Sequence, residues 1–114
     1  MKKKTKNSQN YLDKIPVRSD INWTVDSENI VTLEIENRGW ANRIAQVAFK
    51  KPKISYVHLD KNGSFVWQLV DGVRDITSIG VEVKNKFGDS AEPLYERLSQ
   101  FFRIMESYSF IKFL

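Results

Sequence analysis

The stretch Leu59-Asp60-Lys61-Asn62-Gly63-Ser64-Phe65-Val66-Trp67-Gln68-Leu69-Val70-Asp71-Gly72 decides the fold of this 114-residue chain. It begins where an apolar strand ends, and the Asp60 side chain is suited to accept the first backbone N–H groups of a helix as its N-cap. The pair Val66-Trp67 supplies large apolar side chains for a core. Gly72 tolerates the left-handed backbone that reverses a chain after a helix. The stretch therefore predicts a helix over 61–70 that directly follows a strand.

Upstream of this stretch, apolar and polar residues alternate on both sides of a polar turn at 26–29. Such alternation is typical of an antiparallel strand pair with one buried and one exposed face. A third strand is predicted over 54–59, with Tyr56 and His58 on one face and the apolar residues Val57 and Leu59 on the other. In a meander, this third strand lies at an edge of the sheet. The alternating apolar residues of the hairpin are Ile21, Trp23, Val25, Val31, Leu33 and Ile35.

Two more helices are predicted downstream. The first covers 76–87 and has Asp75 as its N-cap. The second starts near Ala91, where Asp89 and Glu92 have the spacing of a capping box. The main apolar stripe of this last helix is formed by Leu94, Leu98, Phe101 and Met105, with Tyr95 and Phe102 beside it.

A three-stranded antiparallel sheet followed by three helices is an α+β arrangement, similar to a winged-helix domain. We expect residues 15–114 to form this single domain and the polar, lysine-rich residues 1–14 to be a flexible basic tail. A short amphipathic helix within 37–53 is expected to cross an end of the sheet. The apolar end 110–113 is expected to fold back onto the domain.

Composition restricts the class of protein. Apolar residues make up 41% of the chain, which is enough for a folded core. No apolar run approaches the roughly 18 residues of a membrane span, and no apolar stretch follows the first lysines as in a secretory signal. We therefore expect no membrane partner and a location in the cytoplasm. The chain has no cysteine, which excludes disulfides and thiolate metal sites.

Few side chains could perform chemistry. His58 is the one histidine of the chain, and it has no Asp or Glu pair at ligand spacing, so a histidine on a strand face is the simpler interpretation. The serines lack a nucleophile elbow, and the glycines form neither a dinucleotide fingerprint nor a phosphate loop. We therefore expect a non-catalytic protein without metal or cofactor, whose function is binding.

The basic residues are unevenly distributed. Four lysines within residues 1–6 account for the whole formal net charge of +4, so the rest of the chain is balanced. Residues 37–59 carry several cations and no acid, and this segment could attract an acidic partner. A solvated basic loop is the alternative interpretation. The candidate contacts to an acidic partner are Arg43, Lys50, Lys51 and Lys53.

The predicted edge strand over 54–59 is a candidate binding surface. Edge strands are usually protected from further pairing by lysine, proline or bulges within the strand. This strand contains none of these, because Pro52 and Lys53 precede it. An extended peptide could therefore add to the sheet as a fourth strand. The alternative is that another part of the chain, such as the N-terminal arm, covers the edge.

Several residues of the quoted stretch also resemble a known family. They follow the helix pattern of the PqqD family, which is named for a protein of pyrroloquinoline-quinone biosynthesis. The likeness covers about residues 15–114, and Pro16-Val17-Arg18 is similar to the usual opening of the family. The matching residues are Leu59-Asp60, Gly63, Val66-Trp67, Asp71-Gly72, Ile79, Phe87 and Phe110-Ile111.

The resemblance implies a function as a recognition element for ribosomally made peptides. Members of the family bind the leader segment of a precursor peptide and present it to a modifying enzyme, often a radical S-adenosylmethionine protein. The leader adds as a strand beside the third strand, in the cleft formed with the last helix. The connection between Glu36 and Ile54 is longer here than in compact members, and it could either lie over this cleft or add to it. The implied peptide contacts are Ile54, Tyr56, His58, Tyr95, Leu98 and Phe102.

Two other functions stay open. A winged-helix DNA-binding protein would need several cationic or amide side chains on its groove-binding helix. The predicted helices offer Lys84, Lys86, Arg97 and Arg103, but acids offset them, so nucleic acid is not the expected partner. The other alternative is a protein–protein module that uses Trp40 and the basic segment, or a homodimer through the open edge.

Overall fold

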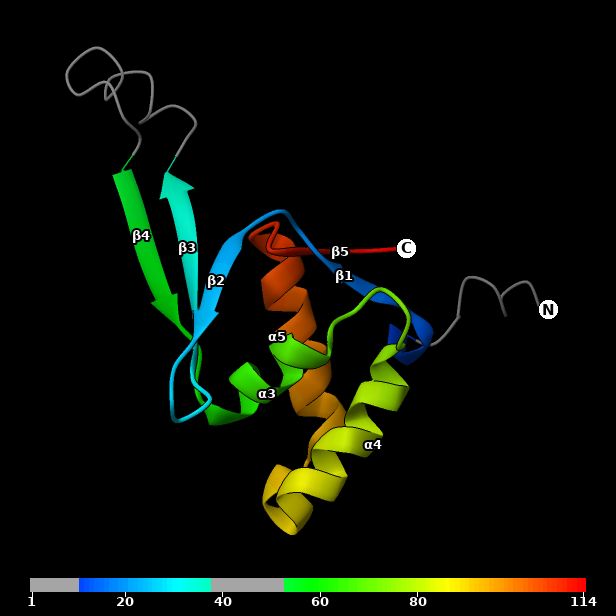
Figure 1. The fold of residues 1–114 in the computed structure, drawn as a ribbon. Coiled ribbons are helices and arrows are strands. Elements are labelled where there is room, and N and C mark those ends of the chain that lie inside the picture. The colour runs from blue at the N-terminus through cyan, green and yellow to red at the C-terminus, as the bar shows by residue number, and fades with distance from the viewer. Residues whose placement is uncertain (1–10, 38–52) are drawn as a thin grey trace. The chain divides into compact units, whose positions relative to one another are not determined.

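The computed structural model describes residues 11–37 and 53–114. They belong to two compact units, of which the first joins the chain up to Asp20 with Phe65–Leu114 and the second is Ile21–Ser64. The described residues contain a three-stranded antiparallel sheet and three α-helices (Figure 1). The expected α+β class is therefore confirmed, and the winged-helix form stays a prediction. The helix expected within 37–53 lies outside the described residues.

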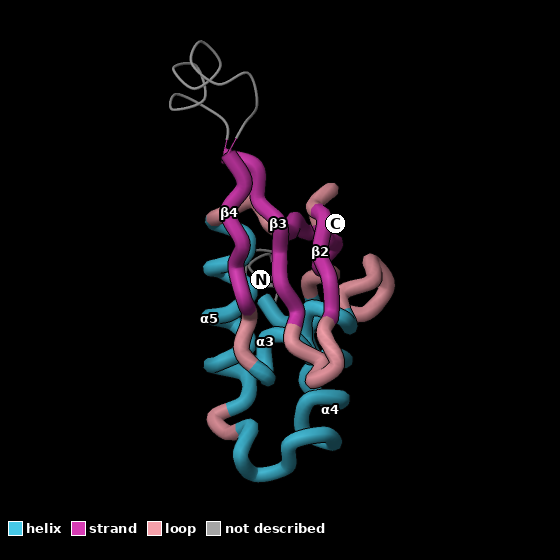
Figure 2. Tube along the Cα trace, turned by 60° about the vertical axis from the view of Figure 1, so that its left-hand side comes forward, coloured by secondary structure: helices cyan, strands magenta, loops and turns pink. Residues whose placement is uncertain are grey.

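The unit of residues 21–64 is built on the sheet, in which the strands lie side by side in the order β2-β3-β4 (Figure 2). β2 spans Asn22–Val25, β3 spans Val31–Asn37 and β4 spans Lys53–His58. Both neighbouring pairs are antiparallel. The predicted hairpin and third strand are therefore confirmed, and β4 lies at an edge of the described sheet.

The two faces of this sheet differ in exposure. Val31 and Leu33 are fully buried on one face. Tyr56 pairs directly with Glu34 across the β3–β4 register, so their side chains lie on the opposite face. Tyr56 is 59% exposed. The predicted face of Tyr56 and His58 is therefore the exposed face of the sheet.

The helix α3 (Lys61–Leu69) follows the sheet as the sequence predicts. The Asp60 carboxylate accepts the Gly63 backbone N–H at 2.7 Å, so Asp60 caps the helix. The pair Val66-Trp67 is buried. After the helix, Gly72 has a φ of 79°, in the left-handed region that favours glycine. The quoted stretch therefore has the strand, cap, helix and reversal that its residues indicate.

A buried serine hydroxyl completes the hydrogen bonds where the sheet meets α3. The Ser64 Oγ accepts the Val31 backbone N–H at 2.8 Å and donates to the Leu59 carbonyl at 3.2 Å. The Leu59 N–H donates to the Val31 carbonyl at 2.9 Å. The hydroxyl therefore takes the place of a direct bond between the Val31 N–H and the Leu59 carbonyl.

Replacing Ser64 with alanine is expected to lower the free energy of unfolding by about 1–3 kcal/mol, because a buried N–H and a buried carbonyl each lose this partner. Urea denaturation followed by circular dichroism measures the loss. The matched control is Ser78→Ala, at an exposed serine, with an expected change within about 0.5 kcal/mol. Equal small losses in the two variants would show that the hydroxyl contributes little.

The other unit contains the two longer helices. α4 spans Ile76–Phe87 and α5 spans Leu94–Ser107. α4 begins and ends where the sequence predicts. The Asp75 carboxylate accepts the Ser78 N–H at 2.8 Å, and Gly88 ends the helix with a φ of 63°.

The predicted start of the last helix near Ala91 is wrong. A 3-10 turn, η2 (Gly88–Ala91), occupies this segment, and α5 begins at Leu94. The reason is Pro93, because a residue that precedes proline is disfavoured in the helical conformation. The helix therefore cannot run through Glu92. The Glu92 carboxylate instead accepts the Leu94 backbone N–H at 3.1 Å.

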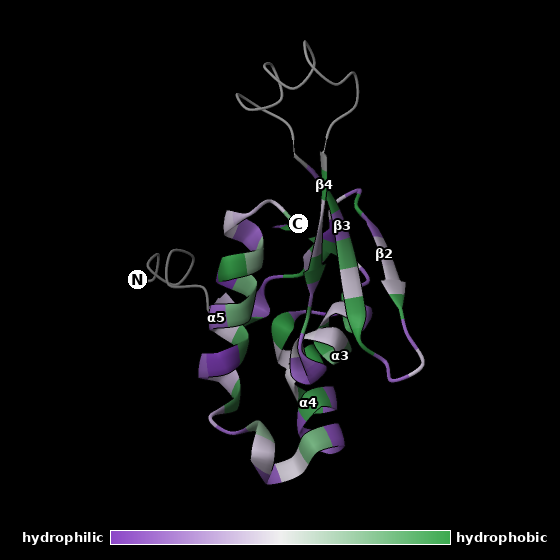
Figure 3. Ribbon diagram, turned by 90° about the vertical axis from the view of Figure 1, so that its left-hand side faces the viewer, coloured by the Kyte–Doolittle hydropathy of each residue, from purple (hydrophilic) through white to green (hydrophobic). Residues whose placement is uncertain are grey.

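The apolar stripe of α5 also differs from the predicted one. Its buried residues are Leu94, Leu98, Phe102 and Met105. Phe101, which was predicted for the stripe, is only half-buried. Most other residues of the helix are polar, with Tyr95 and Ile104 as exposed exceptions, and hydrophilic and hydrophobic residues alternate along α5 in Figure 3. The aromatic residue that α5 contributes to the core is therefore Phe102.

Both ends of the described chain join this unit. β1 (Pro16–Arg18) and β5 (Ile111–Phe113) form an antiparallel pair that the sequence analysis did not predict. Before them lies a short 3-10 helix, η1 (Tyr11–Asp13). The Thr77 hydroxyl of α4 donates to the Leu12 carbonyl at 3.1 Å. The last residues of the predicted tail therefore make contacts within the unit.

Candidate functional site

The outer edge of β4 presents backbone groups of alternate residues. Val31 and Leu59 lie opposite each other and are joined by a backbone hydrogen bond, which makes them a hydrogen-bonded pair of the antiparallel ladder. Hydrogen-bonded and non-hydrogen-bonded pairs alternate along such a ladder. Val57 and Ser55 therefore point their N–H and carbonyl groups toward β3. Those of Ile54, Tyr56 and His58 point away from β3.

The outward groups of β4 meet no further strand in the described part of the chain, because the sheet ends at β4. Tyr56 stands at the middle of this edge. The prediction that this strand contains no lysine is wrong at its first position, because Lys53 belongs to β4; no proline or lysine occurs from Ile54 to His58. A row of outward N–H and carbonyl groups without such protection can pair with an extended chain.

Three of the six implied peptide contacts belong to this edge. The Ile54, Tyr56 and His58 side chains are all exposed. The His58 ring is held in place, since its Nδ1 is hydrogen-bonded to the Thr32 Oγ1 at 2.8 Å. The same three residues thus contribute both outward backbone groups and exposed side chains.

The other three implied contacts lie on α5 and differ in exposure. Tyr95 is 36% exposed, whereas Leu98 is 4% and Phe102 is 0% exposed. The Phe102 ring packs edge-to-face against Phe101 at 5.2 Å between centroids and lies 6.5 Å from the Phe113 ring. Tyr95 therefore offers surface to a partner, while Leu98 and Phe102 are part of the core.

Tyr95 packs on α4 because a glycine makes room for it. A Cβ built on Gly80 would lie 2.6 Å from Cε1 of the Tyr95 ring. The absence of a side chain at Gly80 therefore lets the ring lie against the helix.

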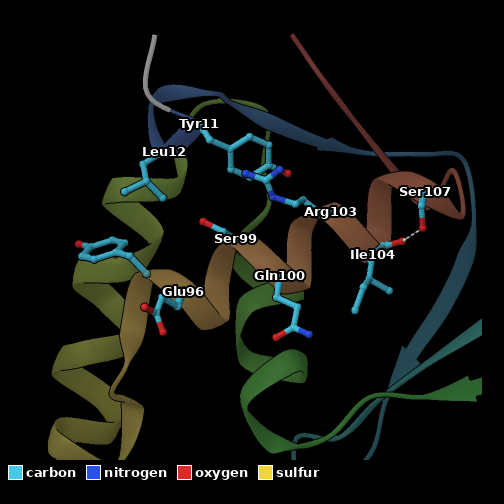
Figure 4. A pocket seen from close by; sticks show the side chains of 9 residues that line it. Tyr11, Leu12, Glu96, Ser99, Gln100, Arg103, Ile104 and Ser107 are labelled. Atoms are coloured by element: carbon cyan, nitrogen blue, oxygen red, sulfur yellow. Dashed lines mark hydrogen bonds between the residues drawn. The ribbon is translucent and has the colours of Figure 1, made fainter. Parts of the chain in front are cut away.

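Tyr95 also lines a shallow pocket of about 720 Å³ between η1 and the surface of α5 (Figure 4). No sequence pattern indicates this pocket, because it is formed by residues that are far apart in the chain. The other lining residues are Tyr11, Leu12, Glu96, Ser99, Gln100, Arg103, Ile104 and Ser107.

Tyr11 and Arg103 form one wall of the pocket. The Arg103 guanidinium carbon lies 4.2 Å from the centroid of the Tyr11 ring, which is a cation–π distance. Burial raises the pKa of the Tyr11 hydroxyl, the Glu106 charge raises it further, and Arg103 opposes both effects. The hydroxyl is therefore a neutral hydrogen-bond donor at physiological pH. Among the described residues it has no hydrogen-bond partner.

The cations that a DNA-binding interpretation would need are engaged within the unit. The Lys84 ammonium lies 2.7 Å from the Glu92 carboxylate and 3.3 Å from that of Asp89. Glu92 raises the pKa of Lys84 through this hydrogen bond. Arg97 donates to the Ser90 carbonyl at 3.1 Å. Arg103 stacks on the Tyr11 ring. Because these cations already interact within the unit, their contacts do not favour the DNA-binding alternative.

The candidate contacts to an acidic partner lie largely beyond the described residues. Arg43, Lys50 and Lys51 are outside them, and of Lys53 the structure describes only the backbone, at the start of β4. Their role stays a prediction.

Residues 11–37 and 53–114 contain no cluster of three or more His, Cys, Asp or Glu residues that could hold a metal ion. None of their helices has the length and apolar character needed to cross a membrane.

The chain matches the family model described as coenzyme PQQ synthesis protein D (PqqD) over residues 42–111, which is more than half of its length. The match contains the whole of the stretch 59–72 and begins after β2 and β3. Comparisons with curated proteins and with solved structures gave no match. Membership supports a role as an accessory protein in the biosynthesis that gives the family its name. The chain belongs to the PqqD family.

Proposed function

We propose that this protein is a non-catalytic adaptor that binds the leader segment of a ribosomally made precursor peptide. The peptide adds to the sheet as a fourth strand at the outer edge of β4, and the adaptor presents it to a modifying enzyme of the radical S-adenosylmethionine class. One observation supports this most directly: the outward backbone groups of Ile54, Tyr56 and His58 have no strand beside them within the described residues.

Strand addition suits this edge for two reasons. Each outward residue offers one N–H donor and one carbonyl acceptor, which give affinity without regard to peptide sequence. The side chains of Ile54, Tyr56 and His58 lie on the exposed face, where they can select among peptides. Of the three α5 residues that the resemblance implies, Tyr95 is proposed as a direct contact because it offers exposed surface, and the buried pair Leu98 and Phe102 is proposed to act by supporting the helix.

Amide hydrogen exchange followed by NMR tests the proposal at single residues. The probe is a peptide selected against the protein from a displayed library of random sequences. Saturation with this peptide is expected to slow exchange of the Ile54, Tyr56 and His58 amides by roughly tenfold or more, because each gains a partner. The amides of Ser55 and Val57 serve as internal controls, since they already point toward β3. Unchanged exchange at all three outward amides would exclude strand addition at β4.

A further inference from the structure

We propose that the peptide residue paired with Tyr56 is positively charged and that arginine fits this position best. The inference rests on the proposed function, because it concerns the side chains of a strand added at β4. It follows from the arrangement of Tyr56 and Glu34 on the exposed face of the sheet.

Tyr56 provides an aromatic surface at this position. Its side chain is 59% exposed, and Tyr56 is in the middle of β4. A residue directly opposite Tyr56 on an added strand would lie on the same face, with its Cβ about 5 Å from that of Tyr56. A guanidinium at this distance can stack on the phenol ring, which attracts a cation through its quadrupole.

Glu34 provides a negative charge just beyond this ring. It pairs with Tyr56 on β3, so the order across the exposed face is added residue, Tyr56 and Glu34. Neighbouring strands are about 4.8 Å apart, and the long stem of arginine can cross the ring toward the carboxylate. Among the described strand residues, this face carries no lysine or arginine that would compete for Glu34.

Ile54 and His58, two positions before and after Tyr56, lie on the same face and indicate what the neighbouring peptide positions prefer. Ile54 is 42% exposed and offers an apolar surface to the residue that pairs with it. His58 uses Nδ1 for the bond to Thr32, which leaves Nε2 for a hydrogen-bonding side chain of the peptide. The preferred peptide therefore has an apolar, a cationic and a hydrogen-bonding residue at three alternate positions.

A double-mutant cycle tests the cationic position. Peptides selected from the random library are aligned, and the basic residue expected at one alternate position is changed from arginine to methionine. This change is expected to weaken binding to the natural protein roughly five- to thirtyfold. Binding to the combined Glu34→Gln and Tyr56→Leu variant is expected to change less than about twofold. Isothermal titration calorimetry measures both ratios, and circular dichroism confirms that the variant is folded.

The outcomes separate this inference from the proposed function. If the selected peptides slow exchange of the Tyr56 amide but show no preferred cation and no coupling to the pair Tyr56 and Glu34, strand addition stands and the charge preference is overturned. If no peptide in the library binds, or if binding leaves the β4 amides unchanged, both ideas are overturned. Coupling of the peptide arginine to the pair Tyr56 and Glu34, together with protection of the Tyr56 amide, supports both.

Discussion

The Tyr56→Pro variant is expected to lose peptide binding while it keeps its fold. The Tyr56 N–H points away from β3, so proline removes a donor at the edge without removing a bond of the β3–β4 ladder. A peptide carbonyl that lacks this donor stays unsatisfied in the complex, which costs about 1–3 kcal/mol, and the proline ring also obstructs the incoming strand. We expect binding to weaken by at least about thirtyfold, measured by calorimetry.

The control for this variant is Tyr56→Ala, which removes the same ring but keeps the N–H. Both variants should unfold at temperatures close to that of the natural protein, because Tyr56 is an exposed residue. Alanine should weaken binding less than proline does, and the difference between them measures the backbone contribution. Equal affinities of the two variants would mean that the peptide does not use the edge of β4.

Replacing Phe102 with alanine is expected to lower the free energy of unfolding by about 3–5 kcal/mol, because it removes a fully buried aromatic ring from the core. Domains of this size are stable by only about 5–15 kcal/mol, so the loss is a large part of the total. Urea denaturation measures it. Any loss of peptide binding in this variant follows first from the smaller folded fraction.

Phe102→Leu and Tyr95→Ala are the matched controls. Leucine keeps most of the apolar volume at the buried position and should cost clearly less than alanine. Tyr95 is partly exposed, so its replacement should change stability little, and a change in peptide affinity would then report a direct contact. If Phe102→Ala were nearly neutral for folding, Phe102 would not be the core residue that its burial indicates.

The hairpin and α4 could be predicted because their residues act locally. Apolar alternation around the turn indicates two strands, and the side chain of Asp75 and the backbone of Gly88 each determine one end of α4. These interactions connect residues that are close in the sequence. No knowledge of the remaining chain is needed to recognise them.

The start of α5 was predicted too early because two local signals compete at this point. Asp89 and Glu92 have the spacing of a capping box, yet Pro93 prevents the helix from beginning there. The choice between Phe101 and Phe102 has a different cause, because these residues lie three and four positions after Leu98 and both spacings place a side chain on the same helix face. The predicted stripe therefore differed by one residue at its aromatic position.

The parts of the site that depend on distant residues could not be predicted. The β1–β5 pair consists of strands of three residues each, which are too short for a periodic pattern. The pocket beside η1 needs Tyr11 and Arg103 to meet, and no local pattern indicates this. Alternation in β4 identified the exposed face, but the outward backbone groups became evident only from the bond between Leu59 and Val31.

The Ser64 hydroxyl bridges Val31 and Leu59, and it thereby holds β3 and β4 in one register at the end of the strand pair that is next to α3. A slip of one residue in β4 would exchange the inward and outward positions of the strand. Since this anchor is at the opposite end of the strand pair from the β3–β4 connection, insertions or deletions in that connection should leave the same three residues presenting their amides. Homologous chains could therefore vary this connection in length while a peptide pairs with β4 in the same register.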